Sequence, residues 1–312
     1  YRLSGAAIFP AQIHDVKGAA RFLRAHSDEY GLDAARFAAW GSSAGGHLTA
    51  LLATSGDVPE LEGTTGDNLE YSSRLQAAVD YFGPTDLLAM NADVTTPPGS
   101  TIDHDAPSSP ESKLIGFDGT GEGIGVLRAN LANLLAPFPE KAALVTLVNP
   151  ITHVSADDPP VFIAHGDLDT SVPMHQSVRL AEALDGVDVE NLMRVVVGAG
   201  HGFGAQSTTV NAEAIAFLTA QFDRVAGDFN GDGDVDGADF LVWKQDFGMN
   251  RAAADANGNG FVDAGDYTVW RDNLSGGGTA ASLPIPEPAT LLMLLIFAGL
   301  GNARFTMSRR QK

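Results

Sequence analysis

The chain has 312 residues, of which 44% are hydrophobic and 19% are charged, so it can form two or three folded domains. Its formal net charge of −20 argues against nucleic acid as a partner, because phosphate binding requires clustered lysine and arginine. It has no cysteine, which excludes disulfides, thiolate catalysis and cysteine-ligated zinc.

Residues 1–224 alternate helical and strand-like patterns. The spacing of apolar residues predicts helices at 11–30, 46–54, 174–184 and 211–224. Short apolar runs predict buried strands at 36–40, 76–82, 160–165 and 193–197. Strands that alternate with helices indicate an α/β fold, a parallel sheet covered on both faces. The segment 90–149, rich in proline and glycine at its start, is predicted to be an insertion over a site.

The pentapeptide Gly41-Ser42-Ser43-Ala44-Gly45 matches the pattern G-x-S-x-G between a predicted strand and a predicted helix. In that context the flanking glycines let the chain turn sharply and expose the central serine. A serine hydroxyl becomes a nucleophile when a neighbouring base takes its proton. Ser43 is therefore the predicted nucleophile, and the N–H of Ala44 is a predicted oxyanion donor. The alternative is a helix start that Ser42 or Ser43 merely caps.

The acid and the base of such a site follow in that order, each in a loop after a later strand. His201 follows the last predicted strand and lies between glycines, so it is the predicted base. The preceding loop offers Asp167 and Asp169. We predict that Asp169 is the acid, because it lies deeper in the loop, and that Asp167 stabilises the turn. Asp86, after an earlier strand, is a third candidate, and His165 is expected to be structural.

Several separated segments of residues 1–224 resemble the carbohydrate-esterase-like α/β-hydrolases, which are related to the hormone-sensitive-lipase group and to feruloyl and acetyl-xylan esterases. The segments are Gly41-Ser42-Ser43-Ala44-Gly45-Gly46-His47, Phe82-Gly83-Pro84-Thr85-Asp86, Asn149-Pro150-Ile151, Asp158-Pro159-Pro160, His165-Gly166-Asp167-Leu168-Asp169-Thr170-Ser171-Val172-Pro173 and Gly200-His201-Gly202-Phe203. The resemblance implies an α/β-hydrolase sandwich with a mostly parallel sheet. It assigns nucleophile, acid and base to Ser43, Asp169 and His201, with no cofactor for catalysis.

One departure from this family concerns the start of the chain. Family members have a His-Gly-Gly oxyanion loop before a segment like Tyr1-Arg2-Leu3, and the present sequence begins after that point. We therefore expect the catalytic domain to be truncated at its N-terminus and to lack the first strands of its sheet. Of the expected oxyanion donors, only Ala44 would remain.

Residues 227–275 contain an approximate repeat of D-x-[DN]-x-[DN]-G with an acid at position twelve, a pattern of calcium loops. The predicted ligands of the first loop are Asp228, Asn230, Asp232, Asp234 through its carbonyl, Asp236 and Asp239. Those of the second are Asp255, Asn257, Asn259, Phe261 through its carbonyl, Asp263 and Asp266. Aspartate at position twelve resembles a type I dockerin, a small helical module with two Ca²⁺ sites. The resemblance implies a cohesin-like partner. A disordered acidic linker is the alternative.

Residues 276–285 are predicted to be a linker. The remaining segment, 286–312, has Pro286-Glu287-Pro288, an apolar run at 289–300 and an arginine-rich end. This layout resembles a PEP-CTERM sorting signal. It implies export, transient membrane contact through the apolar run, removal of the tail and residence at the cell envelope or outside the cell. An ordinary C-terminal membrane anchor is the alternative.

Together these patterns predict a serine carboxylesterase that hydrolyses an ester through an acyl-enzyme. The dockerin-like module favours acetyl or feruloyl esters of polysaccharides as substrates. A serine peptidase of the prolyl-oligopeptidase type shares the order of nucleophile, acid and base and is a second interpretation. A non-catalytic calcium-binding surface scaffold is a third.

Overall fold

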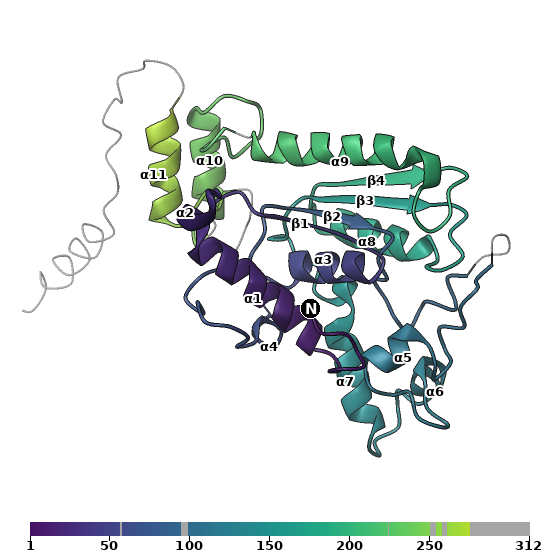
Figure 1. The fold of residues 1–312 in the computed structure, drawn as a ribbon. Helices are drawn as coiled ribbons and strands as arrows, with labels where there is room; N and C mark the ends of the chain where they lie inside the picture. The colour runs from purple at the N-terminus through teal and green to yellow at the C-terminus, as the bar shows by residue number, and fades with distance from the viewer. Residues whose placement is uncertain (57, 95–98, 224, 250–253, 258–260, 275–312) are drawn as a thin grey trace, which may run out of the picture. The chain divides into compact units, whose positions relative to one another are not determined.

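The computed structural model describes residues 1–274 apart from 57, 95–98, 224, 250–253 and 258–260. Its sheet contains four parallel strands that lie in chain order (Figure 1). They are β1 (Ala38–Ser42), β2 (Ala77–Tyr81), β3 (Val161–Gly166) and β4 (Asn191–Val196). The predicted α/β-hydrolase type of fold, with its parallel sheet, is confirmed.

The helices follow the strands as the sequence predicts. Those of residues 1–224 are α1 (Ala11–Ala25), α2 (Ser27–Tyr30), α3 (Ala44–Thr54), α4 (Pro59–Glu62), α5 (Pro110–Leu114), α6 (Ile124–Ala129), α7 (Phe138–Val148), α8 (His175–Asp185) and α9 (Ser207–Phe222). Short 3-10 turns lie at Pro150–Thr152 and Gly204–Gln206, and the acidic repeats contain α10 (Gly237–Asp246) and α11 (Ala264–Asn273). None of the described helices is long and apolar enough to cross a membrane. The apolar run at 289–300 lies outside the described residues.

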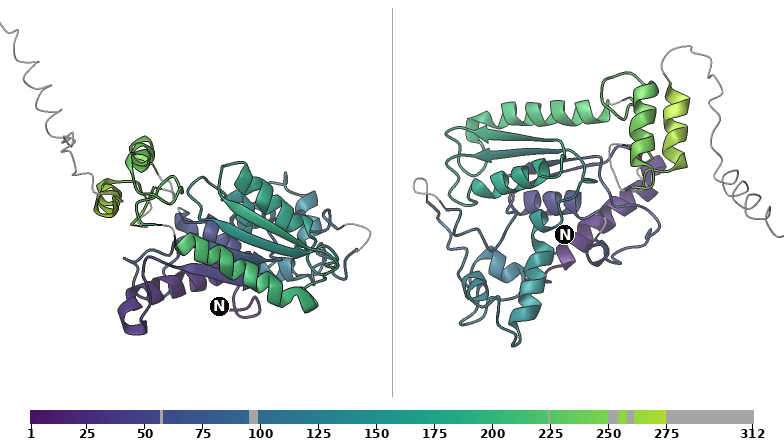
Figure 2. Two further views of the ribbon diagram at one scale, coloured as in Figure 1. Left: turned by 90° about the horizontal axis from the view of Figure 1, so that it is seen from above. Right: turned by 180° about the vertical axis from the view of Figure 1, so that it is seen from behind.

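Alternate side chains of the strands face two separate apolar layers. Ala78 of β2 and Ile163 of β3 belong to a core that also contains buried residues of α1, α3 and α8. Val79 and Phe162, their neighbours in sequence, pack in a second core with residues of α9. The sheet is therefore covered on both faces, with α9 on one side and α3 and α8 on the other (Figure 2). Each fully buried valine or leucine in these layers contributes about 1.5–3 kcal/mol relative to exposure.

The outer strands are less buried than the inner ones. All side chains of β2 and β3 are buried, whereas β1 is only partly covered, and Trp40 on it is 43% exposed. Within the described residues, no strand pairs with the other edge of β1. The strand that leads into Ser43 is therefore an edge strand of the described sheet, and Ser43 lies at the end of this edge strand.

The sequence predicts one continuous helix at 11–30, but the structure has two helices there, α1 and α2, so this prediction is wrong. His26 separates α1 from α2 with φ −110° and ψ 22°, outside helical values. Its Nδ1 lies 2.8 Å from the carbonyl oxygen of Phe22, and the two rings stack at 4.2 Å. The backbone N–H of His26 also donates to this carbonyl at 3.1 Å, so backbone and ring together cap the end of α1 although the apolar periodicity continues.

A buried ionic cluster joins α1 to α4. Glu62 accepts hydrogen bonds from Lys17 at 2.9 Å and from Arg21 at 2.6 Å, and these two cations are 0% and 1% exposed. Burial lowers the pKa of Lys17, and the charge of Glu62 opposes that change. Both cations depend on one carboxylate, so the packing of α1 depends on Glu62.

Candidate active site

Ser43 lies at the sharp turn between β1 and α3. Its φ of 55° and ψ of −122° are strained for a residue with a side chain. Its N–H donates to the carbonyl of Tyr81 at 2.8 Å, which ties the turn to the end of β2. Ser43 is partly exposed. Ala44 is the first residue of α3, so its N–H has no acceptor within the helix.

The turn requires glycine where the backbone approaches its neighbours closely. A Cβ on Gly41 would lie 2.1 Å from the carbonyl oxygen of Gly45. A Cβ on Gly46 would lie 2.4 Å from Oδ1 of Asp80, whereas one on Gly45 would meet nothing within 4 Å. Close packing thus explains the first glycine of the motif and also Gly46, which lies outside the motif. Of the two flanking glycines predicted to allow the turn, Gly41 is thus the one that close contacts require, and Gly45 is not.

The structure brings His201 and Asp169 together. Nδ1 of His201 lies 2.7 Å from Oδ2 of Asp169, and Nδ1 carries the proton because a carboxylate only accepts. The other oxygen, Oδ1, accepts from the N–H groups of Ser171 at 2.7 Å and Val172 at 3.0 Å. Burial opposes the ionisation of Asp169. The hydrogen bonds from His165, His201 and the two amides outweigh it and hold the pKa of this carboxyl well below its usual range.

The loops that carry the acid and the base are in direct contact. The N–H of Leu168 donates to the carbonyl of Ala199 at 2.9 Å. Gly166 ends β3 so close to the second loop that a Cβ there would lie 2.3 Å from that same carbonyl oxygen. Asp167 adds a link between the loops, since its Oδ1 accepts from the N–H of Gly198 at 2.6 Å.

The other two candidate acids therefore have different partners. Asp167 stabilises the loop through Gly198 in the next loop rather than through its own turn. Asp86 accepts from the amide of Asn149 at 3.0 Å and from the N–H of Leu88 at 3.1 Å. Of the three aspartates, Asp169 is the one whose carboxylate meets the ring of His201.

Phe82 links the nucleophile to the base. Its ring lies 4.5 Å from that of His201 and 5.1 Å from that of Phe203, and its backbone has a φ of 45°. It directly follows Tyr81, the acceptor of the Ser43 N–H. Within the described residues, no hydrogen bond joins the hydroxyl of Ser43 to His201, and such bonds often form only when substrate is present. One feature of the sequence points to this contact, the Phe82-Gly83 step directly after a strand.

Asp80 supports the turn that carries Phe82. It is fully buried on β2, and its Oδ1 accepts from the N–H of Gly83 at 2.9 Å. Its Oδ2 is buried without a hydrogen-bond partner. Burial raises the pKa of Asp80 to about 6, and the Gly83 N–H and the electrostatic interaction with His165 act in the opposite direction. This carboxyl was not among the residues predicted from sequence.

The family model of BD-FAE matches residues 1–184, more than half of the chain. The chain belongs to the BD-FAE family. A second family model, the Dockerin type I domain, matches residues 226–275.

Relatives of the BD-FAE chain are esterases by name. It is 31% identical to "Probable carboxylic ester hydrolase LipM" of Mycobacterium tuberculosis over 57% of this chain and 34% of that protein. It is 28% identical to "Esterase LipC" of the same organism over 73% of this chain and 51% of that protein. A solved "Truncated form of carbohydrate esterase from gut microbiota" superposes with a TM-score of 0.59 and 32% identity, covering 71% of this chain and 72% of that one. The chain thus spans about half or less of the length of these two curated relatives.

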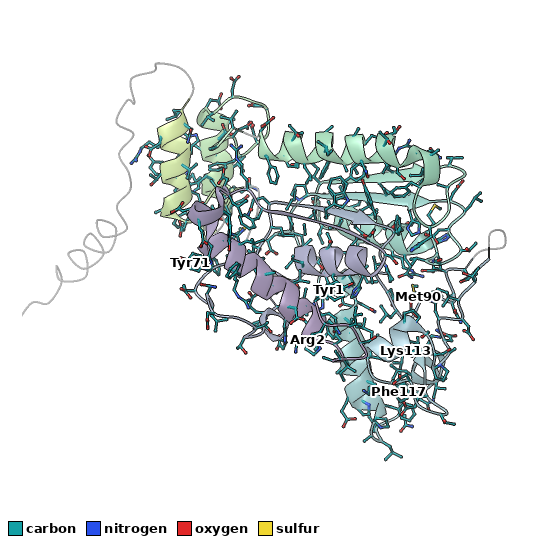
Figure 3. All side chains as sticks on the ribbon, viewed as in Figure 1. Tyr1, Arg2, Tyr71, Met90, Lys113 and Phe117 are labelled. Carbon is teal, nitrogen blue, oxygen red and sulfur yellow. The ribbon has the colours of Figure 1, made fainter. Side chains whose placement is uncertain are left out.

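The insertion at 90–149 lies beside the acid loop of the BD-FAE domain. Met90 and Phe117, labelled in Figure 3, are 0% and 2% exposed and fix the insertion to the domain. The N–H of Thr101 donates to the carbonyl of Thr170 at 2.8 Å, one residue after Asp169. This position agrees with the predicted insertion next to a site.

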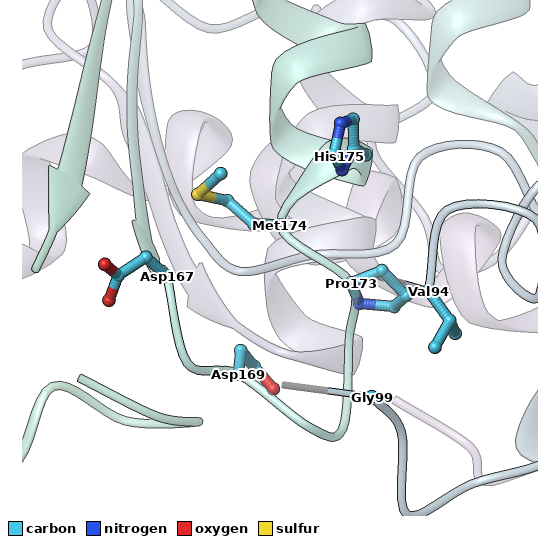
Figure 4. A pocket seen from close by; sticks show the side chains of 7 residues that line it. All are labelled: Val94, Gly99, Asp167, Asp169, Pro173, Met174 and His175. Carbon is cyan, nitrogen blue, oxygen red and sulfur yellow. The ribbon is translucent and has the colours of Figure 1, made fainter. Parts of the chain in front are cut away.

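A small hollow opens beside Asp169 (Figure 4). It is lined by Val94, Gly99, Asp167, Asp169, Pro173, Met174 and His175. Its volume of about 30 Å³ is far below the few hundred Å³ of a typical ligand pocket. It therefore does not define the substrate site.

The Dockerin type I segment closes each acidic loop through the aspartate at position twelve. Asp239 is buried, and its Oδ1 accepts from the N–H groups of Phe229 and Asn230, while its Oδ2 accepts from that of Asp236 at 2.7 Å. Asp236 in turn caps α10, which makes a capping box. The second loop repeats the arrangement with Asp266 as the buried acid, and its N-cap aspartate starts α11.

The donor set of the loops suits calcium by its chemistry. Oδ1 and Oδ2 of Asp228 together accept from the N–H groups of Gly231, Asp232 and Gly233, so the first loop is already curved around this carboxylate. The predicted ligands supply hard oxygen atoms, which Ca²⁺ prefers. Among the described residues, no three acidic or histidine side chains converge as a metal centre in their present positions. The predicted ligand Asn259 lies outside the described residues.

The two repeats exchange hydrogen bonds through their tryptophans. The indole N–H of Trp243 donates to the carbonyl of Asp263 at 2.8 Å. The indole N–H of Trp270 donates to the carbonyl of Asp236 at 2.7 Å. Each acceptor is the residue that caps the helix of the opposite repeat.

Proposed function

We propose that this protein hydrolyses carboxylic esters through an acyl-enzyme formed on Ser43. Nε2 of His201 takes the proton of the hydroxyl, and the serine oxygen attacks the ester carbonyl. The N–H of Ala44 donates to the oxyanion that develops. His201 then gives its proton to the leaving alcohol, and water releases the acid in a second, equivalent step.

One observation carries this proposal. A strained serine lies between a parallel strand and a helix, and the last two strands, β3 and β4, end in loops that join Asp169 to His201 at 2.7 Å. Asp169 fixes the tautomer that leaves Nε2 as an acceptor and stabilises the imidazolium that forms. The esterase names of the relatives support the same class of reaction.

We extend the proposal to esters linked to carbohydrate, with an acetyl or feruloyl acyl group. A carbohydrate esterase is among the structures with which the chain superposes. The Dockerin type I match is the second support, because it indicates an enzyme recruited to a larger assembly.

Hydrolysis of p-nitrophenyl acetate, together with labelling by a fluorophosphonate probe, tests the mechanism. Ser43→Ala should abolish both signals. Ser42→Ala, a change at the exposed neighbouring serine, should retain both. Cleavage of a proline-containing peptide anilide in place of the ester would favour the serine peptidase. Absence of hydrolysis and labelling in the unaltered protein would favour the non-catalytic scaffold.

We also propose that residues 227–275 form a separate module that binds two Ca²⁺ ions and docks to a cohesin-like protein, with residues 1–224 as the catalytic domain. Calorimetric titration should give two sites, and Asp228→Asn or Asp255→Asn should each remove one. Asp272→Asn makes the same charge change at an exposed position after the loops and should leave both sites. A titration with no calcium uptake would contradict this part of the proposal.

We also propose that the protein acts outside the cell or on its surface, and the Dockerin type I match and the carbohydrate esterase among the similar structures support this location. We propose in addition that residues 286–312 act as a sorting tail that contacts the membrane briefly and is removed, after a linker at 276–285. Mass spectrometry of the mature protein tests this, because a removed tail shortens the chain before the apolar run.

A further inference from the structure

His165 is a second histidine at the carboxylate of Asp169. It lies near the end of β3 with its side chain fully buried. Nδ1 lies 2.7 Å from the hydroxyl of Ser177 on α8, and Nε2 lies 2.9 Å from the carbonyl oxygen of Val172. Nε2 also lies 3.3 Å from Oδ2 of Asp169.

These contacts fix where the proton of the ring is. The carbonyl of Val172 can only accept, so Nε2 of His165 carries a hydrogen. In the neutral ring Nδ1 then accepts, and the hydroxyl of Ser177 donates to it. The Nε2–H donates to the carbonyl of Val172 at 2.9 Å, and Oδ2 of Asp169 lies 3.3 Å from the same nitrogen as a second, longer contact.

Oδ2 of Asp169 is also the oxygen that accepts from Nδ1 of His201. It therefore accepts a hydrogen bond from His201 and has Nε2 of His165 in contact at 3.3 Å, while the amides of Ser171 and Val172 hold Oδ1. The two amides contact Oδ1 alone, so they restrict rotation of the carboxylate about its Cβ–Cγ bond only from one side. The donor from His165 restricts this rotation and keeps Oδ2 directed at His201.

We propose that His165 is a positioning residue, whose Nε2–H, oriented by Ser177, keeps Oδ2 of Asp169 in line with Nδ1 of His201. The inference rests on the proposed function, in which Asp169 and His201 activate Ser43. An N–H directed at an ionised carboxylate suits this task, because interactions with a charged acceptor are stronger than those between neutral groups.

Within the described part of the chain, a further ionisable group acts on His165. Asp80 on the neighbouring strand β2 interacts electrostatically with His165. The ring of Phe82 lies 6.1 Å from that of His165 and 4.5 Å from that of His201, so it packs near both histidines. Asp169 is thus the acceptor through which His165 acts on His201.

Two substitutions of His165 distinguish the loss of its N–H donor from the loss of its side-chain volume. His165→Leu removes the donor, whereas the amide nitrogen of the glutamine in His165→Gln can take the place of Nε2. We expect kcat of His165→Leu to fall about ten- to a hundredfold with KM little changed, since a hydrogen bond to a charged group contributes a factor of that order. His165→Gln should recover most of the loss. Ser177→Ala should give a smaller loss, because only the orientation of the ring is relaxed.

The readouts are the pH profile of kcat/KM and the NMR signal of the proton between His201 and Asp169. We expect His165→Leu to move the acidic limb of the profile and to shift or broaden this signal, and His165→Gln to restore both. Losses that follow the stability of each variant, with the profile and the signal unchanged, would overturn the inference. If Ser43 proves inert in the unaltered protein, the proposed function fails, while the NMR signal still reports whether His165 positions Asp169.

Discussion

Replacing Gly166 with alanine should separate the acid loop from the base loop. The added Cβ would lie 2.3 Å from the carbonyl oxygen of Ala199 and 2.6 Å from that of Gly200. Both atoms belong to the backbone, so no side chain can move aside. Relief of the clash requires a displacement of about 1 Å, which would stretch the hydrogen bond from Leu168 to Ala199.

The expected magnitudes follow from this displacement. Overpacking of a core position costs about 1–3 kcal/mol of unfolding free energy. A misplacement of about 1 Å in an active site reduces turnover about 10²-fold. Urea unfolding and p-nitrophenyl acetate hydrolysis measure the two quantities separately.

Gly200→Ala provides a matched control in the facing loop. A Cβ at Gly200 would have the carbonyl oxygen of Leu168 as its nearest neighbour, at an ordinary contact distance of 3.6 Å. This variant should retain the stability and the turnover of the unaltered protein within about twofold. If Gly166→Ala behaved in the same way as Gly200→Ala, the contact between the loops would not position the site, and our reasoning would be refuted.

Three further predictions concern stability and calcium. Asp80→Asn keeps an acceptor for the N–H of Gly83 and removes a carboxyl whose pKa is raised to about 6. In the unaltered protein, ionisation of this carboxyl destabilises the fold as pH rises from about 4 through 6. The variant should be more stable by on the order of 3 kcal/mol at pH 8 and no more stable below pH 4, which urea unfolding at both values checks. Glu62→Gln leaves the buried Lys17 and Arg21 without their counter-ion. It should lower the free energy of unfolding by on the order of 2 kcal/mol, after allowance for the partial exposure of Glu62. The control Glu60→Gln, at an exposed position, should leave the free energy of unfolding unchanged in the same assay. Chelation of calcium should lower the helical circular dichroism of residues 227–275, and an unchanged spectrum would count against coupled binding and folding.

Local patterns in the sequence were sufficient to predict the elements that carry the site. Each strand was placed within about two residues, because a buried apolar run bounded by glycine or a charged turn has few other conformations. The order of Ser43, Asp169 and His201 along the chain followed from the requirement that each lies after a strand. The contact of Asp169 with His201 was expected on that basis, and the structure has it.

The remaining contacts depend on which strands are neighbours and in what register. Gly41 pairs with Asp80, and Asp80 pairs with Ile163, so a buried carboxyl of β2 lies next to the turn of Ser43. Periodicity alone gives neither the register nor the depth of Asp80. The role of His165 was likewise out of reach, because a histidine at the end of a strand has no distinguishing spacing. Its partner Ser177 comes from α8, a separate element.

The crossed tryptophans make the two repeats of the Dockerin type I segment depend on each other. Trp270 donates to the residue that starts α10, and Trp243 donates to the residue that starts α11. A single repeat would leave its own indole without an acceptor and its own helix cap without a donor. Neither half is therefore a minimal module, and a tag made from one repeat should stay unfolded where the pair folds. Any evolutionary loss of one repeat would remove the other as a folded unit.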